Sequence, residues 1–489
     1  MKKYIVAIDQ STSATKVFLI GEKGRILRRA SKPHGQFYPH AGWAEHDAAE
    51  IWQNTLCGIK EVTSGVDTGE IAALSICNQR ETTLFWDKAT GEPLRRAIVW
   101  QDVRAGELCS ELSAHAERIR SVTGLELSPY YSAAKAAHAL RADRDLMQKA
   151  KDGEALIGTV DSYLIYRLTK GKNFFTDVTN ASRTQLFDID KLDYDAGICE
   201  AFGIPVHCLA RALPSDGDFG TVDREYLPGD VRITGVMGDS HASLFAQGCT
   251  KRGMVKTSYG TGSSVMMNTG RERVSAKGLS ASIAYGFDGE VDYVLEGNIT
   301  HSGDTLRWLC DEAEMASSPA EAERIAASVG DCGGVYLVPA FSGMGAPYFV
   351  SEARAAFVGL SRSSTRAHMV RAAVESMAYQ NADVILSMLS HANCEIDRLN
   401  ADGGGCKNGL LMQLQADLLL CPVSASSETE LSALGSAIMA ARKCGLYTAE
   451  EAETGEKKLY MPRITKEERD ERMRKWFEAV SLVLGRNIE

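Results

Sequence analysis

The sequence predicts a mixed α/β fold built from two related lobes, and three observations support this prediction. The chain has 489 residues, enough for two to four domains at roughly 100–200 residues each. Short strand-like runs alternate with helical periodicity in the N-terminal half. A strand, a turn rich in small residues and a second strand occur at residues 4–20 and again at residues 253–267. We therefore expect a first lobe over residues 1–247 and a second over residues 248–489.

Composition excludes several classes of protein. Hydrophobic residues make up 44% of the chain and charged residues 24%, which is typical of a folded globular protein. Lys and Arg number 54 against 64 Asp and Glu, so no basic surplus favours nucleic acid or an anionic membrane as a partner. No apolar run approaches the roughly 20 residues of a membrane span, and the first is too short for a signal peptide.

The cysteine pattern indicates a reducing compartment. Twelve cysteines are scattered without a C-x-x-C pair, which favours reduced thiols over disulfides or a zinc site. We expect a cytoplasmic protein in which any metal ion is held by oxygen.

The first hairpin is predicted to have strands at residues 4–8 and 16–20, followed by a turn at 21–24 and a strand at 26–27. Its connecting turn holds Asp9 and the hydroxyl residues Ser11, Thr12 and Ser13. Small residues let a phosphate approach backbone N–H groups, and Lys16 can offer a point charge to a phosphoryl group. An ordinary surface hairpin with a solvated lysine is the alternative.

A helix should begin near residue 48, because Asp47 and Glu50 have capping-box spacing ahead of a helical apolar pattern. Strands are then expected at residues 71–76, 83–86 and 97–100. Trp52, Trp86 and Trp100 are core residues by default.

Two charged positions stand near predicted strand ends. Arg80 and Glu81 lie between apolar strands, as a structural ion pair or as the floor of a site that binds hydroxyls. Asp239 follows the strand-like residues 233–237, at the edge where α/β lobes usually bind ligands. It is a candidate general base or Mg²⁺ ligand, with a helix N-cap as the alternative. His241 is expected to be a core or pocket-lining residue.

In the second half, the loop at residues 259–263 is able to wrap phosphates, although the loop taken alone favours a plain turn. The glycine run at residues 402–405 precedes Asn408 and an apolar segment, and such a helix start can accept a nucleotide. Helical periodicity extends over residues 368–389. The Lys- and Glu-rich residues 457–476 are expected to form a solvated terminal helix.

Several segments, in chain order, resemble the glycerol kinases of the FGGY carbohydrate kinase family: residues 9–16, 78–83, 97–101, 158–161, 179–184, 259–262, 341–348, 359–362, 371–379 and 402–405. The resemblance implies two actin-like or hexokinase-like (ribonuclease-H-like) lobes with a deep cleft between them. It also implies Mg²⁺-dependent transfer of the ATP γ-phosphoryl to a small polyol, with glycerol as the leading acceptor and glycerol 3-phosphate as the product.

The resemblance assigns roles residue by residue. Asp239 is the general base, Lys16 faces the transferring phosphoryl group, and Asp9 and Asp239 lie near the metal ion. The acceptor is held by Arg80, Glu81, Trp100, Tyr130, Asp239, Ser240 and Thr300. ATP is bound by Ser11, Thr12, Ser13, Thr261, Gly262, Gly303, Gly404, Gly405 and Asn408.

Departures from the family pattern affect the acceptor pocket. Ser240 and His241 follow the base where glycerol kinases have Gln, and Thr300 replaces a Phe. Losing the aromatic wall removes on the order of 1–3 kcal/mol of apolar contact and leaves room for a larger acceptor. A kinase of xylulose or erythritol type is therefore the close alternative. Lys16 replaces an Arg and loses its bidentate fork.

An actin-like ATPase that binds partner proteins is the alternative from another class. Arg80, Glu81 and Asp239 argue against it, because such an ATPase has no need for hydroxyl-binding groups. The family resemblance also implies a homodimer or homotetramer. Residues 227–232 resemble a region where some relatives bind a sugar-bisphosphate inhibitor, but the loop is shorter here.

Overall fold

The computed structural model describes residues 2–488, which fall into two compact units. The first unit contains the chain up to Gly248 together with Ala281–Tyr293 and Glu430–Thr454. The second contains Cys249–Ser280, Val294–Thr429 and the chain from Gly455 onward. The strands β17 (Ser280–Phe287) and β18 (Glu290–Ile299) lie where the chain passes between the units. Each unit is described separately below.

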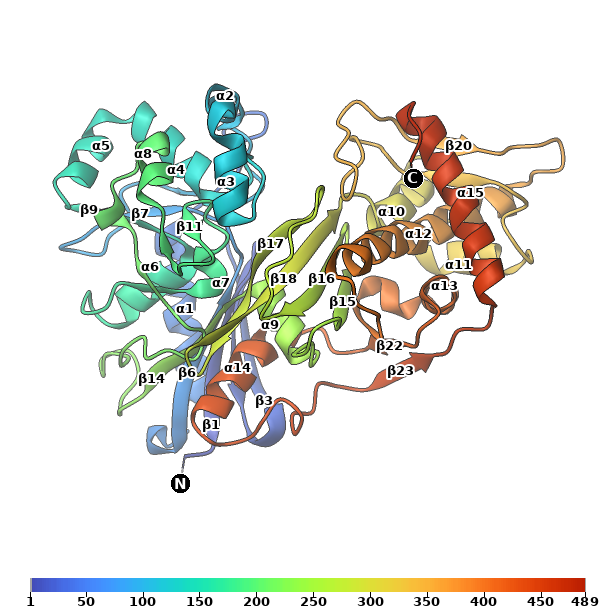
Figure 1. Cartoon of the computed structure of the whole chain (residues 1–489). Coiled ribbons are helices and arrows are strands. Elements are labelled where there is room, and N and C mark those ends of the chain that lie inside the picture. Colours follow the sequence, from blue (N-terminus) through green and yellow to red (C-terminus); the bar gives the residue numbers. More distant parts are fainter. Residues whose placement is uncertain (1, 489) are drawn as a thin grey trace. The chain divides into compact units, whose positions relative to one another are not determined.

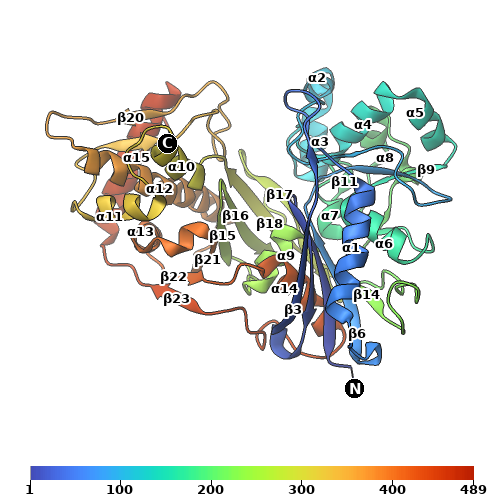
Figure 2. The ribbon, with the colours of Figure 1, turned by 180° about the vertical axis from the view of Figure 1, so that it is seen from behind.

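The first unit is organised around a five-stranded sheet with the order β14-β6-β1-β2-β3 (Figures 1 and 2). β1, β2 and β3 form an antiparallel meander, whereas β6 is parallel to β1 and β14 is parallel to β6. Parallel strands end at the same edge, so residues that follow β6 and β14 are brought together. These strands are β1 (Tyr4–Gln10), β2 (Ala14–Ile20), β3 (Ile26–Pro33), β6 (Ile71–Asn78) and β14 (Arg232–Gly238).

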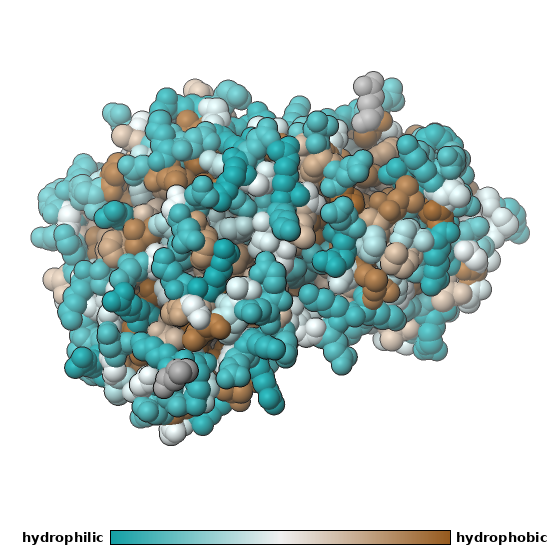
Figure 3. Space-filling model, turned by 60° about the horizontal axis from the view of Figure 1, so that its bottom comes forward, coloured by the Kyte–Doolittle hydropathy of each residue, from teal (hydrophilic) through white to brown (hydrophobic). Residues whose placement is uncertain are grey.

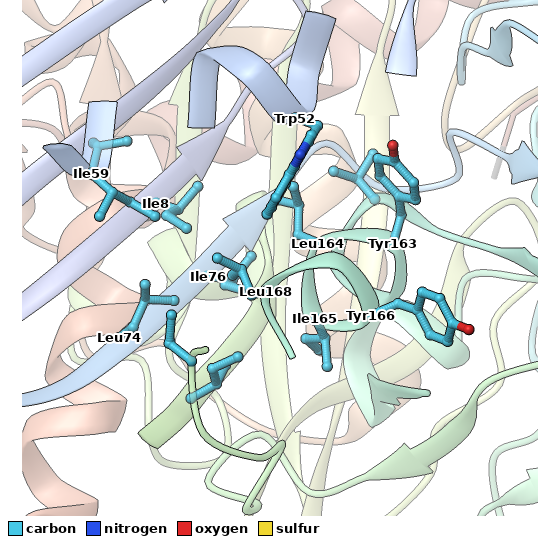
Figure 4. Packing of buried hydrophobic residues seen from close by; sticks show 14 of the residues in the cluster. Ile8, Trp52, Ile59, Leu74, Ile76, Tyr163, Leu164, Ile165, Tyr166 and Leu168 are labelled. Carbon is cyan, nitrogen blue, oxygen red and sulfur yellow. The ribbon is translucent and has the colours of Figure 1, made fainter. Parts of the chain in front are cut away.

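Helix α1 (Ala48–Thr63) covers one face of this sheet. Asp47 caps it as predicted, accepting hydrogen bonds from the backbone of Ala49 and Glu50, which satisfies N–H groups that have no partner within the helix. The predicted capping box is not formed, because the Glu50 carboxylate accepts the Gly35 N–H instead. Because strand side chains alternate between faces, Val6 and Ile8 point toward this helix. Figure 4 shows the resulting core, which joins side chains of β1, β6, α1 and α6 (Val160–Leu168).

Helix α14 (Leu431–Lys443) belongs to the opposite face, although it comes from the third segment of the unit. It contacts β1, β6, β14 and α9 (Asp239–Ala246). The Ser75 and Ser436 hydroxyls lie 3.2 Å apart. A Cβ at Gly435 would lie 1.8 Å from the carbonyl oxygen of Ala242, so only glycine allows α14 to pack this closely on α9.

The remaining elements of the first unit surround this sheet. The strands are β4 (Gln36–Phe37), β5 (Glu45–His46), β7 (Leu84–Asp87), β8 (Ala97–Ile98), β9 (Ala155–Gly158), β10 (Phe175–Asp177), β11 (Phe187–Asp188), β12 (Asp193–Tyr194) and β13 (Arg211–Leu213). The helices are α2 (Gly106–Glu111), α3 (Ala116–Thr123), α4 (Ser132–Ala142), α5 (Arg144–Lys151), α7 (Val178–Ala181) and α8 (Ala196–Phe202), with short 3₁₀ turns at Glu22–Gly24, Thr68–Glu70, Ser113–His115 and Val206–Cys208.

The second unit repeats the strand pattern of the first. β15 is antiparallel to β16 and parallel to β21, and β21 is parallel to β22, which matches the relations of β1 to β2 and β6, and of β6 to β14. The strands are β15 (Val255–Tyr259), β16 (Ser263–Gly270), β19 (Tyr336–Val338), β20 (Ala356–Val358), β21 (Leu399–Gly403), β22 (Val423–Ser426) and β23 (Lys457–Tyr460). The helices are α10 (Gly303–Asp311), α11 (Pro319–Ala327), α12 (Arg366–Ala392), α13 (Gly409–Leu419) and α15 (Lys466–Leu484), and η5 (Gly404–Lys407) is a 3₁₀ turn.

The C-terminal region differs from its prediction. Residues 457–460 form strand β23, which pairs with β22, so a helix over residues 457–476 is wrong in its first part. The helix α15 begins instead after Thr465, whose side chain forms a capping box with Glu468. Met473 and Trp476 are buried, so α15 is not fully solvated.

The surface carries scattered hydrophobic residues among hydrophilic ones on the face shown in Figure 3. Large exposed side chains such as Leu27, Tyr38 and Phe349 come from separate elements, which is ordinary for a protein surface. The cysteines of the described chain are free thiols. Helices within residues 2–488 are all too short or too polar to cross a membrane.

Candidate active site

The predicted site residues fall into two groups, one in each unit. The first unit holds Asp9, Ser11, Thr12, Ser13, Lys16, Arg80, Glu81, Trp100, Tyr130, Asp239 and Ser240, and the second holds Thr261, Gly262, Thr300, Gly303, Gly404, Gly405 and Asn408.

The first group includes the turn between β1 and β2. The Ser11 backbone N–H and hydroxyl both donate to the carbonyl oxygen of Ala14, at 3.0 and 2.9 Å. Thr12 accepts a 3.0 Å hydrogen bond from the Trp100 indole, and Ser13 is exposed. The Ser11 hydroxyl therefore closes the turn, and Thr12 connects it to Trp100, which is predicted to bind the polyol.

Lys16 lies opposite Asp9 in the hairpin register. Its Nζ is 3.7 Å from Asp9 Oδ2 and 2.8 Å from Glu430 Oε2. Glu430 also pairs with Arg29 at 3.0 Å. Glu430 immediately precedes α14, so the helix that covers the sheet also delivers a carboxylate to the lysine.

Asp9 is a buried carboxyl next to this lysine. Burial raises the pKa of Asp9 to about 6, although Lys16 and a hydrogen bond from the Cys77 thiol act in the opposite direction. The negative charges of Asp239 and Glu430 also raise the pKa of Asp9. A divalent cation would relieve this repulsion, because hard cations favour carboxylate oxygens.

Arg80 and Asp239 meet at the ends of β6 and β14. In the register of these strands Gly238 lies opposite Asn78, so the residues just beyond both ends are neighbours. Arg80 Nε is 3.4 Å from Asp239 Oδ1. The same oxygen accepts the backbone N–H of Ser240 at 2.6 Å. Asp239 is also the first residue of α9, where the helix dipole stabilises a negative charge.

Glu81 is buried and paired with another residue. Its Oε1 accepts a 2.6 Å hydrogen bond from Arg183 Nε, and both side chains are almost fully buried. The φ of Glu81 is 60°, a left-handed conformation that is uncommon for a residue with a side chain. Arg80 and Glu81 each form an ion pair with a residue far along the chain: Arg80 pairs with Asp239, and Glu81 pairs with Arg183.

Trp100 and Tyr130 form an aromatic pair. Their ring centroids are 5.7 Å apart with an interplanar angle of 64°, an edge-to-face arrangement. Trp100 is partly exposed, unlike Trp52 and Trp86, which are buried in the core. The ammonium of the buried Lys135 donates to the carbonyl oxygens of Pro129 and Tyr130, which fixes the segment that carries Tyr130.

The second group is assembled around the end of β15. The backbone N–H groups of Gly303 and Asp304 donate to Gly260 and Thr261, both at 3.0 Å, so α10 begins directly on this loop. A Cβ at Gly303 would lie 2.5 Å from the Gly260 carbonyl oxygen, and one at Gly262 would lie 2.3 Å from that of Ile299. These close backbone approaches require glycine.

The glycine run joins the same group. Tyr259 pairs with Gly403 in the parallel β15–β21 register, and a Cβ at Gly405 would lie 2.7 Å from the Tyr259 Cβ. Gly404 has open space around it. Asn408 caps α13 by accepting the Leu411 N–H at 2.9 Å, so Gly404 and Gly405 belong to η5 and do not open α13 directly.

Thr300 is exposed at the end of β18. The next residue, His301, lies with Nδ1 2.9 Å from Asp304 Oδ2 and Nε2 2.7 Å from Ser342 Oγ. Thr300 is therefore followed by a hydrogen-bonded group of polar side chains. His241 is fully buried in the first unit, 3.3 Å from the Ser282 hydroxyl.

Sequence reasoning missed several residues that support these groups. Arg183 pairs with Glu81 from a distance of 102 residues, and Glu430 pairs with Lys16 from 414 residues away. Thr179 also contacts the end of β14, and Asp177 contacts Thr179. Thr179 and Arg183 lie in the family-like segment 179–184, but nothing in that segment indicates their partners, and no local pattern distinguishes Asp177 or Glu430 from ordinary polar residues. No cluster of three or more His, Cys, Asp or Glu side chains suited to a metal ion occurs within residues 2–488.

The chain is similar to known proteins over nearly its whole length. Residues 4–246 match the N-terminal domain of the FGGY family of carbohydrate kinases, and residues 255–444 match its C-terminal domain. The glycerol kinase of Natranaerobius thermophilus is 40% identical, and the alignment covers 99% of each chain. Glycerol kinase 1 of Thermotoga maritima is 44% identical over 98% of this chain and 99% of that protein.

Solved structures give the same result. The crystal structure of Plasmodium falciparum glycerol kinase with ADP superposes with a TM-score of 0.93, at 34% identity and 98% coverage of both chains. The predicted α/β fold with two related lobes is confirmed. Both domain matches and the full-length relatives show that this chain belongs to the FGGY family of carbohydrate kinases.

Proposed function

We propose that this protein transfers the γ-phosphoryl group of ATP to a hydroxyl of glycerol, forming glycerol 3-phosphate and ADP. The observation that carries the proposal is the pair Arg80 and Asp239, held at the ends of adjacent parallel strands with the aromatic rings of Trp100 and Tyr130 in the same unit. A guanidinium and a carboxylate can bind hydroxyls, and aromatic rings can cover a carbon chain. The full-length similarity to glycerol kinases supports the same acceptor.

Asp239 acts as the general base in this proposal. Its Oδ1 already accepts the Ser240 N–H and lies beside Arg80, so we assign proton acceptance to Oδ2. The proton of the acceptor hydroxyl passes to this oxygen as the hydroxyl attacks the γ-phosphorus, and ADP leaves. Phosphoryl transfer depends mainly on positioning and charge neutralisation.

The hairpin and the second unit would hold the nucleotide. Ser11 closes the turn through Ala14, Thr12 and Ser13 offer N–H and hydroxyl groups to the phosphates, and Lys16 offers a positive charge. In the second unit the rest of ATP would lie against the loop at Thr261 and Gly262, the start of α10 at Gly303 and the glycine run before Asn408, where the lack of side chains lets a ligand approach the backbone.

The carboxylates Asp9 and Asp239 fit a magnesium ion. Both lie in the first unit, and the negative charge of Asp239 raises the pKa of Asp9. Mg²⁺ usually takes one or two carboxylates and completes its shell with water and phosphate oxygens. When bound, it supplies positive charge to the phosphate oxygens.

A larger polyol or ketose is the second candidate acceptor. Ser240 and Thr300 favour it, because both are smaller than the Gln and Phe of the family pattern. If the pocket has been enlarged, Thr300→Phe combined with Ser240→Gln should raise the kcat/KM ratio of glycerol to xylulose or erythritol by about tenfold. Ratios that stay constant would remove these two positions from the specificity argument.

The cell compartment and assembly are also proposals. Free thiols and the full-length similarity to glycerol kinases support the cytoplasm, and we expect a homodimer or homotetramer that needs neither nucleic acid nor membrane. Analytical ultracentrifugation of the purified chain tests the assembly state.

The function is tested by ADP release with Mg-ATP and matched concentrations of glycerol, erythritol, pentitols, xylulose, ribulose and dihydroxyacetone, beside a blank without acceptor. We expect the highest kcat/KM with glycerol. Asp239→Asn should lower kcat by about 10²–10⁴-fold and keep ADP binding. Substantial kcat in this variant would show that the base is another residue, and ADP release without acceptor would favour an ATPase.

A further inference from the structure

The two strand ends that carry Arg80 and Asp239 are connected through buried side chains of α7 and the residue before it. Gly238, the last residue of β14, donates its backbone N–H to the Thr179 hydroxyl at 2.8 Å. Gly238 is also the N-cap position of α9 and has no side chain with which to fix the helix start. The Thr179 oxygen therefore supplies a fixed anchor one residue before Asp239.

The direction of the Thr179 hydroxyl is set by Asp177. The hydroxyl donates its single proton to Asp177 Oδ1 at 2.9 Å. Its lone pairs are then left to accept the Gly238 N–H. Without this carboxylate the hydroxyl could rotate and direct its proton elsewhere, so Asp177 acts on Gly238 through Thr179.

Asp177 is itself held rigidly. It is fully buried, and Oδ1 accepts the backbone and side-chain amides of Asn180 at 2.9 and 2.8 Å. Its Oδ2 accepts the Thr179 backbone N–H and the Ser215 hydroxyl, both at 2.9 Å. A buried carboxylate with this many donors is stable only in one orientation.

The same carboxylate reaches the end of β6. The side-chain amides of Asn180 and Asn78 exchange hydrogen bonds at 3.0 and 3.1 Å. Asn78 is the last residue of β6, two positions before Arg80, and lies opposite Gly238 in the strand register. Asp177 is thus connected to β14 through Thr179 and to β6 through Asn180.

We propose that Thr179, oriented by Asp177, is a positioning residue for Asp239, and that this buried network keeps Asp239 and Arg80 in register for phosphoryl transfer. The inference rests on the proposed function, because it gives the Arg80–Asp239 pair its catalytic meaning. The separation of 3.4 Å between Arg80 Nε and Asp239 Oδ1 depends on both strand ends. A displacement of about 1 Å at a reacting group can lower the rate by about 10²-fold.

The test compares Thr179→Val, which removes the hydroxyl and keeps the shape, with Thr179→Ser, which keeps the hydroxyl. Thr184→Val is the matched control, since Thr184 is a buried threonine of the same segment whose hydroxyl donates to the Ala181 carbonyl at 2.7 Å. Each kcat is divided by the number of ADP-binding sites, so that misfolded molecules are not counted.

We expect Thr179→Val to lower kcat per ADP site by about 10–100-fold, with KM for ATP changed less than about threefold. Thr179→Ser and Thr184→Val should stay within about threefold of the wild type. An unchanged kcat per site in Thr179→Val, or an equal loss in Thr184→Val, would overturn the proposal. If Thr179→Val gives no ADP-binding protein, Thr179→Cys replaces it under the same criteria.

Asp177→Asn tests the path through Thr179. Its effect on kcat should not add to that of Thr179→Val, because both changes remove the same anchor. Effects that multiply in the double variant would refute the role of Asp177. Failure of the proposed function is recognised separately, since the wild type would then release no ADP with glycerol, and the variants would be compared with the acceptor that it does use.

Discussion

Asp9 and Lys16 face each other across the first hairpin, but the carboxyl is buried and the ammonium is partly exposed. This difference explains why the pKa of Asp9 is raised to about 6 despite a cation only 3.7 Å away. The cost of removing a carboxylate from water exceeds the attraction of one lysine that also serves Glu430.

Activity should therefore fall as the pH falls through about 6, because protonated Asp9 cannot bind a cation. Measuring kcat/KM for Mg-ATP between about pH 5 and pH 8 tests this. Asp9→Asn should show low activity over the whole range. An acid limb that lies far from pH 6, or one that survives in a still active Asp9→Asn variant, would assign the limb to another group.

The free energy of unfolding should increase as the pH falls, whereas the activity should decrease. Between about pH 4 and pH 6 the folded chain keeps the Asp9 proton, whereas the unfolded chain has lost it above its ordinary pKa of 3.8. Ionising Asp9 thus lowers the free energy of unfolding as the pH rises, by on the order of 2–3 kcal/mol. Urea unfolding of the wild type and Asp9→Asn at both ends of this range should show a smaller pH dependence in the variant.

Residue types at strand ends could be predicted from the sequence, but their partners could not. Asp239 and Arg80 were identifiable because charged side chains directly beside apolar strands are unusual. Glu430 and Arg183 were not, since each is an ordinary charged residue until the fold brings it to Lys16 or Glu81. Long-range ion pairs leave no pattern in sequence spacing.

At the scale of elements, the start of α10 is fixed to the loop after β15 by backbone contacts that exclude a side chain. Gly303→Ala would place a Cβ 2.5 Å from the Gly260 carbonyl, and neither backbone can yield without moving the loop. We expect ADP affinity to fall at least about tenfold, measured by calorimetry. Gly330→Ala is the control, because Gly330 has open space around it.

A loss of ADP affinity in both glycine variants would indicate general destabilisation of the second unit. Unchanged affinity in Gly303→Ala would mean that this junction does not shape the nucleotide site. Thermal unfolding of both variants separates these outcomes, since only a local effect leaves the melting temperature of Gly303→Ala near that of the control.

Elements with local signals were predicted well. The cap at Asp47 defines α1, and two strand-like apolar runs around a turn of small residues define β1 and β2. β23 was assigned to a helix because its lysines suit either structure, and its strand conformation comes from pairing with β22. Tertiary pairing of this kind overrides a weak local preference.

At the scale of the whole chain, the first unit is completed by a segment that lies far along the sequence. Leu434, Ile438 and Met439 of α14 are buried, and each contributes roughly 1.5–3 kcal/mol by burial. The sequence could predict two lobes from two hairpins, but the return of residues 430–454 to the first unit has no compositional signature.

A fragment that ends at Gly248 should therefore not fold cooperatively. It lacks α14, so one face of its sheet is exposed to water. We expect urea unfolding followed by circular dichroism to show no sharp transition, while the full chain shows one. A cooperative transition in the fragment would mean that α14 is dispensable for this unit.

The late position of α14 also has a consequence for biosynthesis. The ribosome makes the five strands of the first sheet before residue 239, but it makes their second covering helix only after residue 430. While the residues between β14 and α14 are made, the nascent chain carries an uncovered apolar sheet face, which is prone to aggregation. Cells that make this protein must protect that face until α14, which ends at Lys443, has emerged from the ribosome.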